Sequence, residues 1–96
     1  MDESNRVNSA NTRARKLGLE ADLTLDQWIA ILESYNYSCG YCGGHFEEID
    51  HVRPLSEGGA TTAGNVIPCC SKCNKRKGST TWTTNPRQMI FTFTST

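Results

Sequence analysis

Two pairs of cysteines constrain this sequence more than any other feature. Each pair has the spacing Cys-x-x-Cys, and the four residues are Cys39, Cys42, Cys70 and Cys73. Two thiolates with two residues between them can bind one metal ion from a single tight turn, and a second such pair completes a closed tetrahedral zinc site. The pattern therefore predicts a structural zinc ion that joins two distant segments and leaves no ligand position for catalysis.

A cross-link of this kind is expected in a chain of 96 residues, because a domain of that size buries only about 60–65% of its unfolded surface. Two disulfides are the alternative, but the polar N-terminal stretch has no secretory signal, which indicates a reducing cytoplasm and favours zinc. No apolar run approaches the roughly eighteen residues of a membrane span, so we expect a soluble protein. The fifth cysteine, Cys69, is interpreted as a small buried side chain.

The N-terminal part has the pattern of helices. Residues 1–8 are polar without a period, which predicts a flexible N-terminus over residues 1–10, followed by a short basic helix over residues 11–19. Thr24 and Gln27 have the spacing of a capping box. Apolar residues then recur at helical spacing: Leu25, Trp28, Ile29, Leu32 and Tyr35. We expect an amphipathic helix with Trp28 in the core rather than as a platform for stacking bases.

Between and after the cysteine pairs, the order is strand, strand, helix. Ile49 favours a strand within residues 46–52, and Ile67 favours a second strand that Pro68 ends. Residues 71–77 can form about two helical turns before Gly78 stops them. The pattern over residues 79–96 is compatible with helix or strand. The fold class predicted is small α+β, with residues 11–96 as a single domain.

The same segment resembles the HNH endonuclease family with a four-cysteine zinc site. The resemblance covers residues 39–78 and rests on the runs IDHVRPLS at 49–56, GNVIP at 64–68 and CSKCNKRKG at 70–78. It implies a ββα-metal, treble-clef-like core, which agrees with the order of elements above, and it implies a DNA endonuclease. The N-terminal helical stretch is similar to phage-type members, which is compatible with a phage-encoded protein in a bacterial cytoplasm and with phage or host proteins as further partners.

The resemblance also implies roles for individual residues. His51 takes the place of the general base, Asn65 the middle place of the motif, and Asp50 with Asn74 the places that hold a catalytic divalent ion. Asn74 stands where histidine is frequent, which makes the motif an HNN variant. An amide oxygen suits hard ions, so we expect Mg²⁺ or Mn²⁺ as the catalytic cofactor. Gly64-Asn65 is also a common turn dipeptide, and we expect the Asn65 side chain to brace the loop that carries His51.

These residue types suit phosphodiester hydrolysis. A histidine with a pKa near 6.5 can take a proton from water at neutral pH. A divalent ion can stabilise the negative charge that develops on the phosphoryl and leaving oxygens. Asp50 and His51 are adjacent in a predicted strand, so their side chains point to opposite faces. They can act on one phosphate only if the metal ion lies on one side of it and the base on the other.

Charge is unevenly distributed, although the formal net charge is zero. Residues 51–78 contain five basic residues and one acidic residue, and an acidic cluster precedes them. The predicted contacts to nucleic acid are Arg53, Lys75, Arg76 and Lys77. An ordinary solvated face is the alternative for these four.

A second functional class remains compatible with the cysteines and the basic helix. It is a catalytically inactive zinc-binding module that interacts with DNA or protein. Such a module has no need for Asp50, His51 and Asn74 together, and this is why we favour the enzyme.

Overall fold

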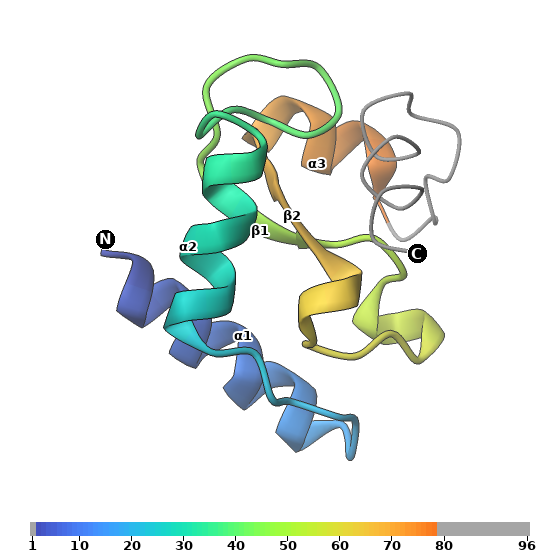
Figure 1. Ribbon diagram of the computed structural model, residues 1–96. Coiled ribbons are helices and arrows are strands. Elements are labelled where there is room, and N and C mark those ends of the chain that lie inside the picture. The colour runs from blue at the N-terminus through green and yellow to red at the C-terminus, as the bar shows by residue number, and fades with distance from the viewer. Residues whose placement is uncertain (1, 79–96) are drawn as a thin grey trace.

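The computed structural model describes residues 2–78 and has the fold class expected, small α+β. Its elements are α1 (Glu3–Lys16), α2 (Leu25–Ser34), β1 (Glu48–His51), two short 3₁₀ turns η1 (Leu55–Glu57) and η2 (Ala63–Asn65), β2 (Val66–Cys69) and α3 (Ser71–Lys77). The two strands form one antiparallel sheet. Figure 1 shows this hairpin in the middle of the molecule, with α1 and α2 at one side and α3 at the other.

The second strand extends one residue beyond Pro68, where the sequence pattern predicted its end. The pattern predicted that Pro68 ends the second strand, but β2 continues to Cys69, and Pro68 lies opposite Ile49. The carbonyl of Pro68 accepts a hydrogen bond from the Gly40 amide at 2.8 Å. Successive residues of an antiparallel strand alternate in the side to which their backbone groups point. The backbone of Pro68 therefore points away from β1, and its missing N–H removes no hydrogen bond from the hairpin.

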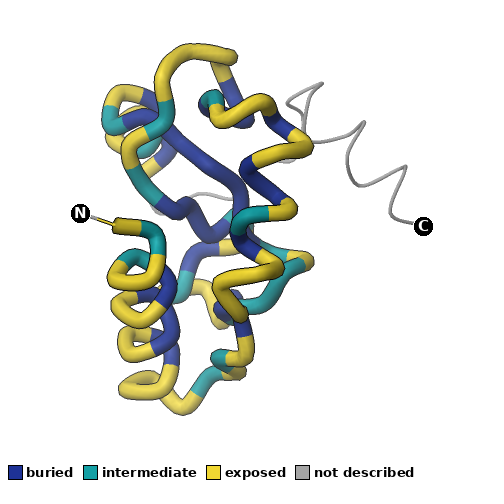
Figure 2. Tube along the Cα trace, turned by 60° about the vertical axis from the view of Figure 1, so that its left-hand side comes forward, coloured by how far each residue is buried: buried dark blue, intermediate teal, exposed yellow. Residues whose placement is uncertain are grey.

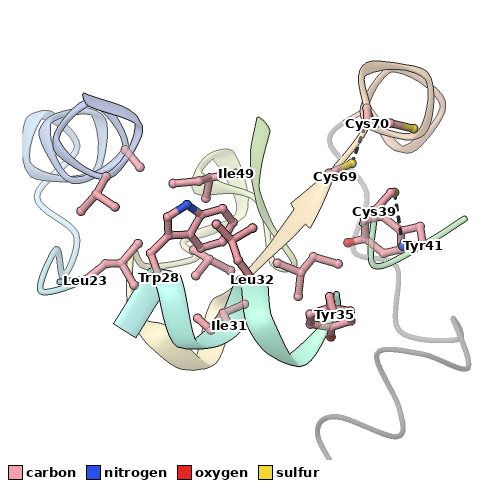
Figure 3. Close-up of a cluster of buried hydrophobic side chains, with 14 of the residues drawn as sticks. Leu23, Trp28, Ile31, Leu32, Tyr35, Cys39, Tyr41, Ile49, Cys69 and Cys70 are labelled. Carbon is pink, nitrogen blue, oxygen red and sulfur yellow. Dashed lines mark hydrogen bonds between the residues drawn. The ribbon is translucent and has the colours of Figure 1, made fainter. Parts of the chain in front are cut away.

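Helix α2 forms as predicted and supplies the centre of the core. Thr24 and Gln27 make both hydrogen bonds of the capping box, at 3.0 and 3.1 Å. Trp28 and Leu32 are fully buried, which confirms the assignment of Trp28 to the core. Figure 3 shows Trp28 and Leu32 directed from α2 into the apolar cluster, with Ile49 of β1 facing them.

Helix α1 corrects the prediction for the N-terminus. It starts at Glu3, where a flexible segment over residues 1–10 was expected, and the side chain of Asp2 caps it by accepting the Asn5 amide at 2.8 Å. Val7 and Ala10 are buried, and Figure 2 shows a buried stripe along this otherwise exposed helix. Ala14 is buried as well, and three small apolar side chains among polar residues are a weak helical signal in sequence, yet they pack the helix against the core.

No helix within residues 2–78 is long and apolar enough to cross a membrane. Residues 79–96, for which the sequence pattern is compatible with helix or strand, lie outside the described residues.

Candidate functional site

The four cysteines of the two pairs come together as predicted. Their sulfur atoms all lie within 4.8 Å of one another. A tetrahedral ion with zinc–sulfur bonds of about 2.3 Å requires sulfur atoms about 3.8 Å apart, and the sulfurs of Cys42 and Cys70 are separated by 3.7 Å. Cys70 is the N-cap of α3, and Cys73 lies in its first turn. The cluster is thus positioned to hold one metal ion between α3 and the loop that follows α2.

The backbone around the cluster favours thiolates. Amide groups donate to three of the sulfurs at 3.4 Å each: Tyr41 to Cys39, Gly44 to Cys42 and Cys73 to Cys70. Burial raises the pKa of Cys39, but hydrogen bonds from the backbone of Cys42, Cys70 and Tyr41 and from the Cys42 thiol outweigh it and lower the pKa to about 7. Burial raises the pKa of Cys73 to about 12, with further contributions from the neighbouring sulfurs. Four sulfurs so close together need a cation before all of them ionise.

Cys69 stays outside this cluster, as predicted. It is fully buried, and its thiol donates to the carbonyl of Cys70 at 3.2 Å. Burial raises the pKa of the Cys69 thiol well above its usual range. The residue is therefore a neutral side chain of the core.

A pocket of about 170 Å³ lies at the end of β1 and brings together the residues predicted as general base and as ligands of the catalytic ion. Asp50, His51 and Asn74 all line it, and Lys77 and Arg13 complete its polar wall. Asp50 interacts with α3 and the cysteine loop, whereas His51 contacts the loop before η2. The two adjacent side chains thus border one pocket while making contacts with different parts of the fold, as their alternation along a strand requires.

His51 is held as a neutral, buried imidazole. Only 7% of the residue is exposed, and its Nε2 lies 2.8 Å from the hydroxyl oxygen of Thr61. Burial lowers the pKa of His51 to about 4, and the positive charges of Arg13 and Lys77 act in the same direction. A neutral imidazole is the form that a general base requires.

Asp50 is the buried acidic group of the pocket. The hydroxyl of Tyr41 donates to one carboxylate oxygen at 2.6 Å, and the Lys77 ammonium lies 3.4 Å from the other. Burial raises the pKa of Asp50 even though Tyr41 and Lys77 act to lower it. The site therefore still favours additional positive charge, which is what a ligand of a divalent ion needs.

Asn74 presents its amide to the same pocket. Its Nδ2 group donates to a carboxylate oxygen of Glu48, which precedes Asp50 by two residues on the same face of β1. With the amide nitrogen turned toward Glu48, the carbonyl oxygen is the atom left to act as a ligand. A carboxylate and an amide oxygen are donors suited to Mg²⁺ or Mn²⁺, and the pocket of about 170 Å³ has room for water molecules beside an ion. The residues thus fit a hydrated divalent ion.

Asn65 braces the loop after β1, as expected, but it does not line the pocket. Its side-chain oxygen accepts the Arg53 amide at 2.8 Å, and its Nδ2 group donates to the carbonyls of Arg53 and Ala60 at 3.1 and 2.8 Å. The loop is tight at this point, since a Cβ atom on Gly59 would come within 1.8 Å of the Arg53 carbonyl oxygen. Asn65 therefore holds the backbone of the loop that follows His51 in place through its hydrogen bonds.

The basic residues predicted to contact nucleic acid divide into two groups. Arg53, Lys75 and Arg76 are exposed. Lys77 is only 2% exposed, and its ammonium donates to the His51 carbonyl at 2.9 Å in addition to its ion pair with Asp50. Lys77 therefore does not share the exposed position of the other three residues, because the helix turns its side chain into the pocket.

Arg13 is a site residue that the sequence reasoning missed. It lines the pocket at His51 and also an adjoining groove of about 440 Å³ between α1 and β1. Arg6 and Ser9 of α1 line the same groove, opposite Glu47 and Glu48. The signal in the sequence was the helical spacing of Arg6, Ser9 and Arg13, which is informative only once the helix is known to begin at Glu3.

Comparison with known proteins agrees with this geometry. Residues 39–80 match the family model described as HNH endonuclease. Over 54 residues the chain is 35% identical to a CRISPR-associated endonuclease Cas9 of Corynebacterium diphtheriae, a match that covers 51% of this chain and 5% of that protein. No solved structure matches. The family match begins at Cys39 and includes every residue of the predicted motif, which confirms the resemblance stated from the sequence.

Proposed function

We propose that this chain, whose residues 39–80 match the HNH endonuclease family model, is a metal-dependent endonuclease that hydrolyses phosphodiester bonds of DNA. The observation that carries the proposal is the pocket at the end of β1, where Asp50, His51 and Asn74 border the same space. A module that only binds DNA or protein gains nothing from a buried neutral imidazole beside a carboxylate and an amide oxygen.

In this proposal the cysteine cluster binds zinc and has a structural role. Four thiolates fill a tetrahedral coordination shell, so no position is left for substrate. Asn74 directly follows the ligand Cys73, and both lie in the first turns of α3. Zinc would therefore hold α3 against the loop that follows α2 and keep the Asn74 amide facing Asp50 and Glu48.

His51 acts as the general base. Its neutral ring can take a proton from a water molecule that attacks the phosphorus atom. Asp50 and Asn74 would hold the divalent ion, which when bound supplies stabilisation of the negative charge on the phosphoryl and leaving oxygens. Tyr41 and Lys77 keep the Asp50 carboxylate in place, and Glu48 keeps the carbonyl of Asn74 available.

DNA is the proposed partner, and basic side chains of the motif and of α1 support this. Arg53, Lys75 and Arg76 are exposed on the loop and helix of the motif. Arg13 of α1 lines the pocket itself. Arginine and lysine in such positions contact phosphates and set the register of a strand, whatever its base sequence.

Removal and return of a divalent ion test the proposal directly. Plasmid DNA should remain intact with the protein in EDTA and should be nicked or linearised when Mg²⁺ or Mn²⁺ is supplied in excess, because charge on the transition state is then stabilised. Agarose gels read the result. Circular dichroism in EDTA is the control, since it shows whether the fold and its structural zinc survive the chelator.

The inactive binding module makes the opposite prediction. It would retard DNA in a native gel and leave it uncut with each metal. Uncut DNA across the whole panel, from a protein that is folded and binds one zinc per chain, contradicts the enzymatic proposal and favours that alternative.

Arg13→Ala should weaken DNA binding and reduce its dependence on salt. Loss of one phosphate contact lowers the slope of the logarithm of affinity against the logarithm of salt concentration by about 1. Fluorescence anisotropy with a labelled duplex, without divalent ions, measures both quantities. Lys16→Ala is the matched control, since it removes one exposed positive charge from the same helix at a residue that lines neither cavity. An equal loss in both variants would mean that only the overall charge of α1 matters.

A further inference from the structure

The side chain of Thr61 lies between α1 and the imidazole of His51. Its hydroxyl donates to the carbonyl of Ala10 at 3.0 Å, and the same oxygen lies 2.8 Å from His51 Nε2. Thr61 is fully buried, so no solvent competes for these two bonds. A continuous chain of hydrogen bonds therefore runs from the backbone of α1 to the ring of His51.

The direction of each bond in this chain follows from the atoms involved. A carbonyl oxygen can only accept, so the Thr61 proton points to Ala10. A hydroxyl has one proton, and the Thr61 oxygen is thereby left as an acceptor toward His51. Nε2 must then be the donor. Because a neutral imidazole has a single N–H, Nδ1 is the unprotonated nitrogen.

The backbone of Thr61 is fixed as firmly as its side chain. Its amide donates to the Glu20 carbonyl at 2.9 Å, and its carbonyl accepts from the amides of Asp22 and Leu23 at 3.0 and 3.2 Å. Thr61 thus pairs with the segment between α1 and α2, and this pairing fixes the position of the backbone from which its hydroxyl reaches His51.

We propose that Thr61 is a positioning residue that selects the Nε2–H tautomer of His51, so that Nδ1 is the nitrogen that takes the proton from water. The proposal rests on the function proposed above for His51. It also gives α1 and the segment after it a part in the chemistry, although both lie outside the matched residues 39–80.

A purely structural role for Thr61 makes different predictions. In that case the hydroxyl only satisfies the Ala10 carbonyl, and its loss affects stability without changing the tautomer of His51 or the rate of the chemical step. The tautomer of His51 therefore separates the two roles independently of catalysis.

Nitrogen NMR of protein labelled with ¹⁵N-histidine reads the tautomer directly. The chain has two histidines, His45 and His51, and His45→Ala assigns their signals. We expect wild-type His51 to show a protonated Nε2 and an unprotonated Nδ1. Thr61→Val keeps the shape of the side chain but removes the acceptor, and it should give a mixture of tautomers. Thr61→Ser keeps the hydroxyl and should restore the single tautomer.

The cleavage rates should follow the tautomers, with Thr61→Ser close to the wild type and Thr61→Val slower. The kcat of Thr61→Val should fall by about 10- to 100-fold, the usual effect of losing a group that orients a reacting side chain, while the Kd for DNA stays unchanged. Thr61→Ser should retain most of the activity. Thr62→Val is the matched control, because Thr62 is the next residue, half-buried, and its side chain makes no capping hydrogen bond.

A wild-type His51 protonated at Nδ1 overturns the proposal, and so does a Thr61→Val variant with the wild-type kcat. If Thr61→Val does not fold, the spectra of the wild type and of Thr61→Ser still decide which nitrogen carries the proton. If the wild type does not cut DNA at all, the proposed function fails, and the same spectra separately decide whether Thr61 selects the tautomer.

Discussion

His51→Ala should reduce the rate of DNA cleavage by about 10²- to 10⁴-fold, the usual contribution of a positioned general base. Alanine has no group that can take a proton from water, whereas Asp50 and Asn74 remain to bind a divalent ion. Initial rates of plasmid nicking at saturating Mg²⁺ or Mn²⁺ measure the effect. DNA affinity and the zinc content of one ion per chain should stay as in the wild type, because His51 does not contact the cysteine cluster.

His45→Ala is the matched control for this prediction, since it is the same substitution at an exposed histidine outside the pocket. It should cut DNA at the wild-type rate. The His51 variant also leaves Thr61 without its imidazole partner, so its thermal unfolding is compared with that of the wild type. A folded His51→Ala protein that cuts normally would show that another group is the base.

Cys39→Ser should abolish zinc binding and unfold the chain. A structural zinc ion contributes about 10–16 kcal/mol in small zinc domains, which is as large as the whole stability of a typical domain, about 5–15 kcal/mol. Cys39 is also fully buried, so a hydroxyl in its place lies in an apolar site without the ion. Elemental analysis for zinc and far-UV circular dichroism measure the two losses.

Cys69→Ser provides the control within the same region. Cys69 is equally buried and adjacent to a ligand, but its sulfur lies outside the cluster, so this variant should retain one zinc ion per chain and the wild-type spectrum at room temperature. A Cys39→Ser protein that is fully folded and free of zinc would contradict the structural role of the metal.

Local patterns were enough for the parts of the fold that depend on near neighbours in the chain. Spacings within a single helix predicted the capping box at Thr24 and the burial of Trp28. The local pattern of each segment likewise predicted the order of strand, strand and helix. The pairing of the two cysteine motifs was equally predictable, because one metal ion requires four ligands and each Cys-x-x-Cys turn supplies two. Helix α1 was misjudged, because a helix that docks through few apolar residues has a weak period and owes its stability to its partners.

The environment of the site depended on contacts that no local spacing reveals. Lys77 belongs to a run of basic residues that looks exposed in sequence, yet it is buried against Asp50. Arg13 and Thr61 come to His51 from segments that precede it by 38 positions and follow it by 10. The amino-acid sequence by itself determined which side chains we propose for the chemistry and which cysteines can hold a metal ion. Only the tertiary structure decided which hydroxyl His51 contacts and which charges face it, because burial and hydrogen bonding are properties of the packed chain.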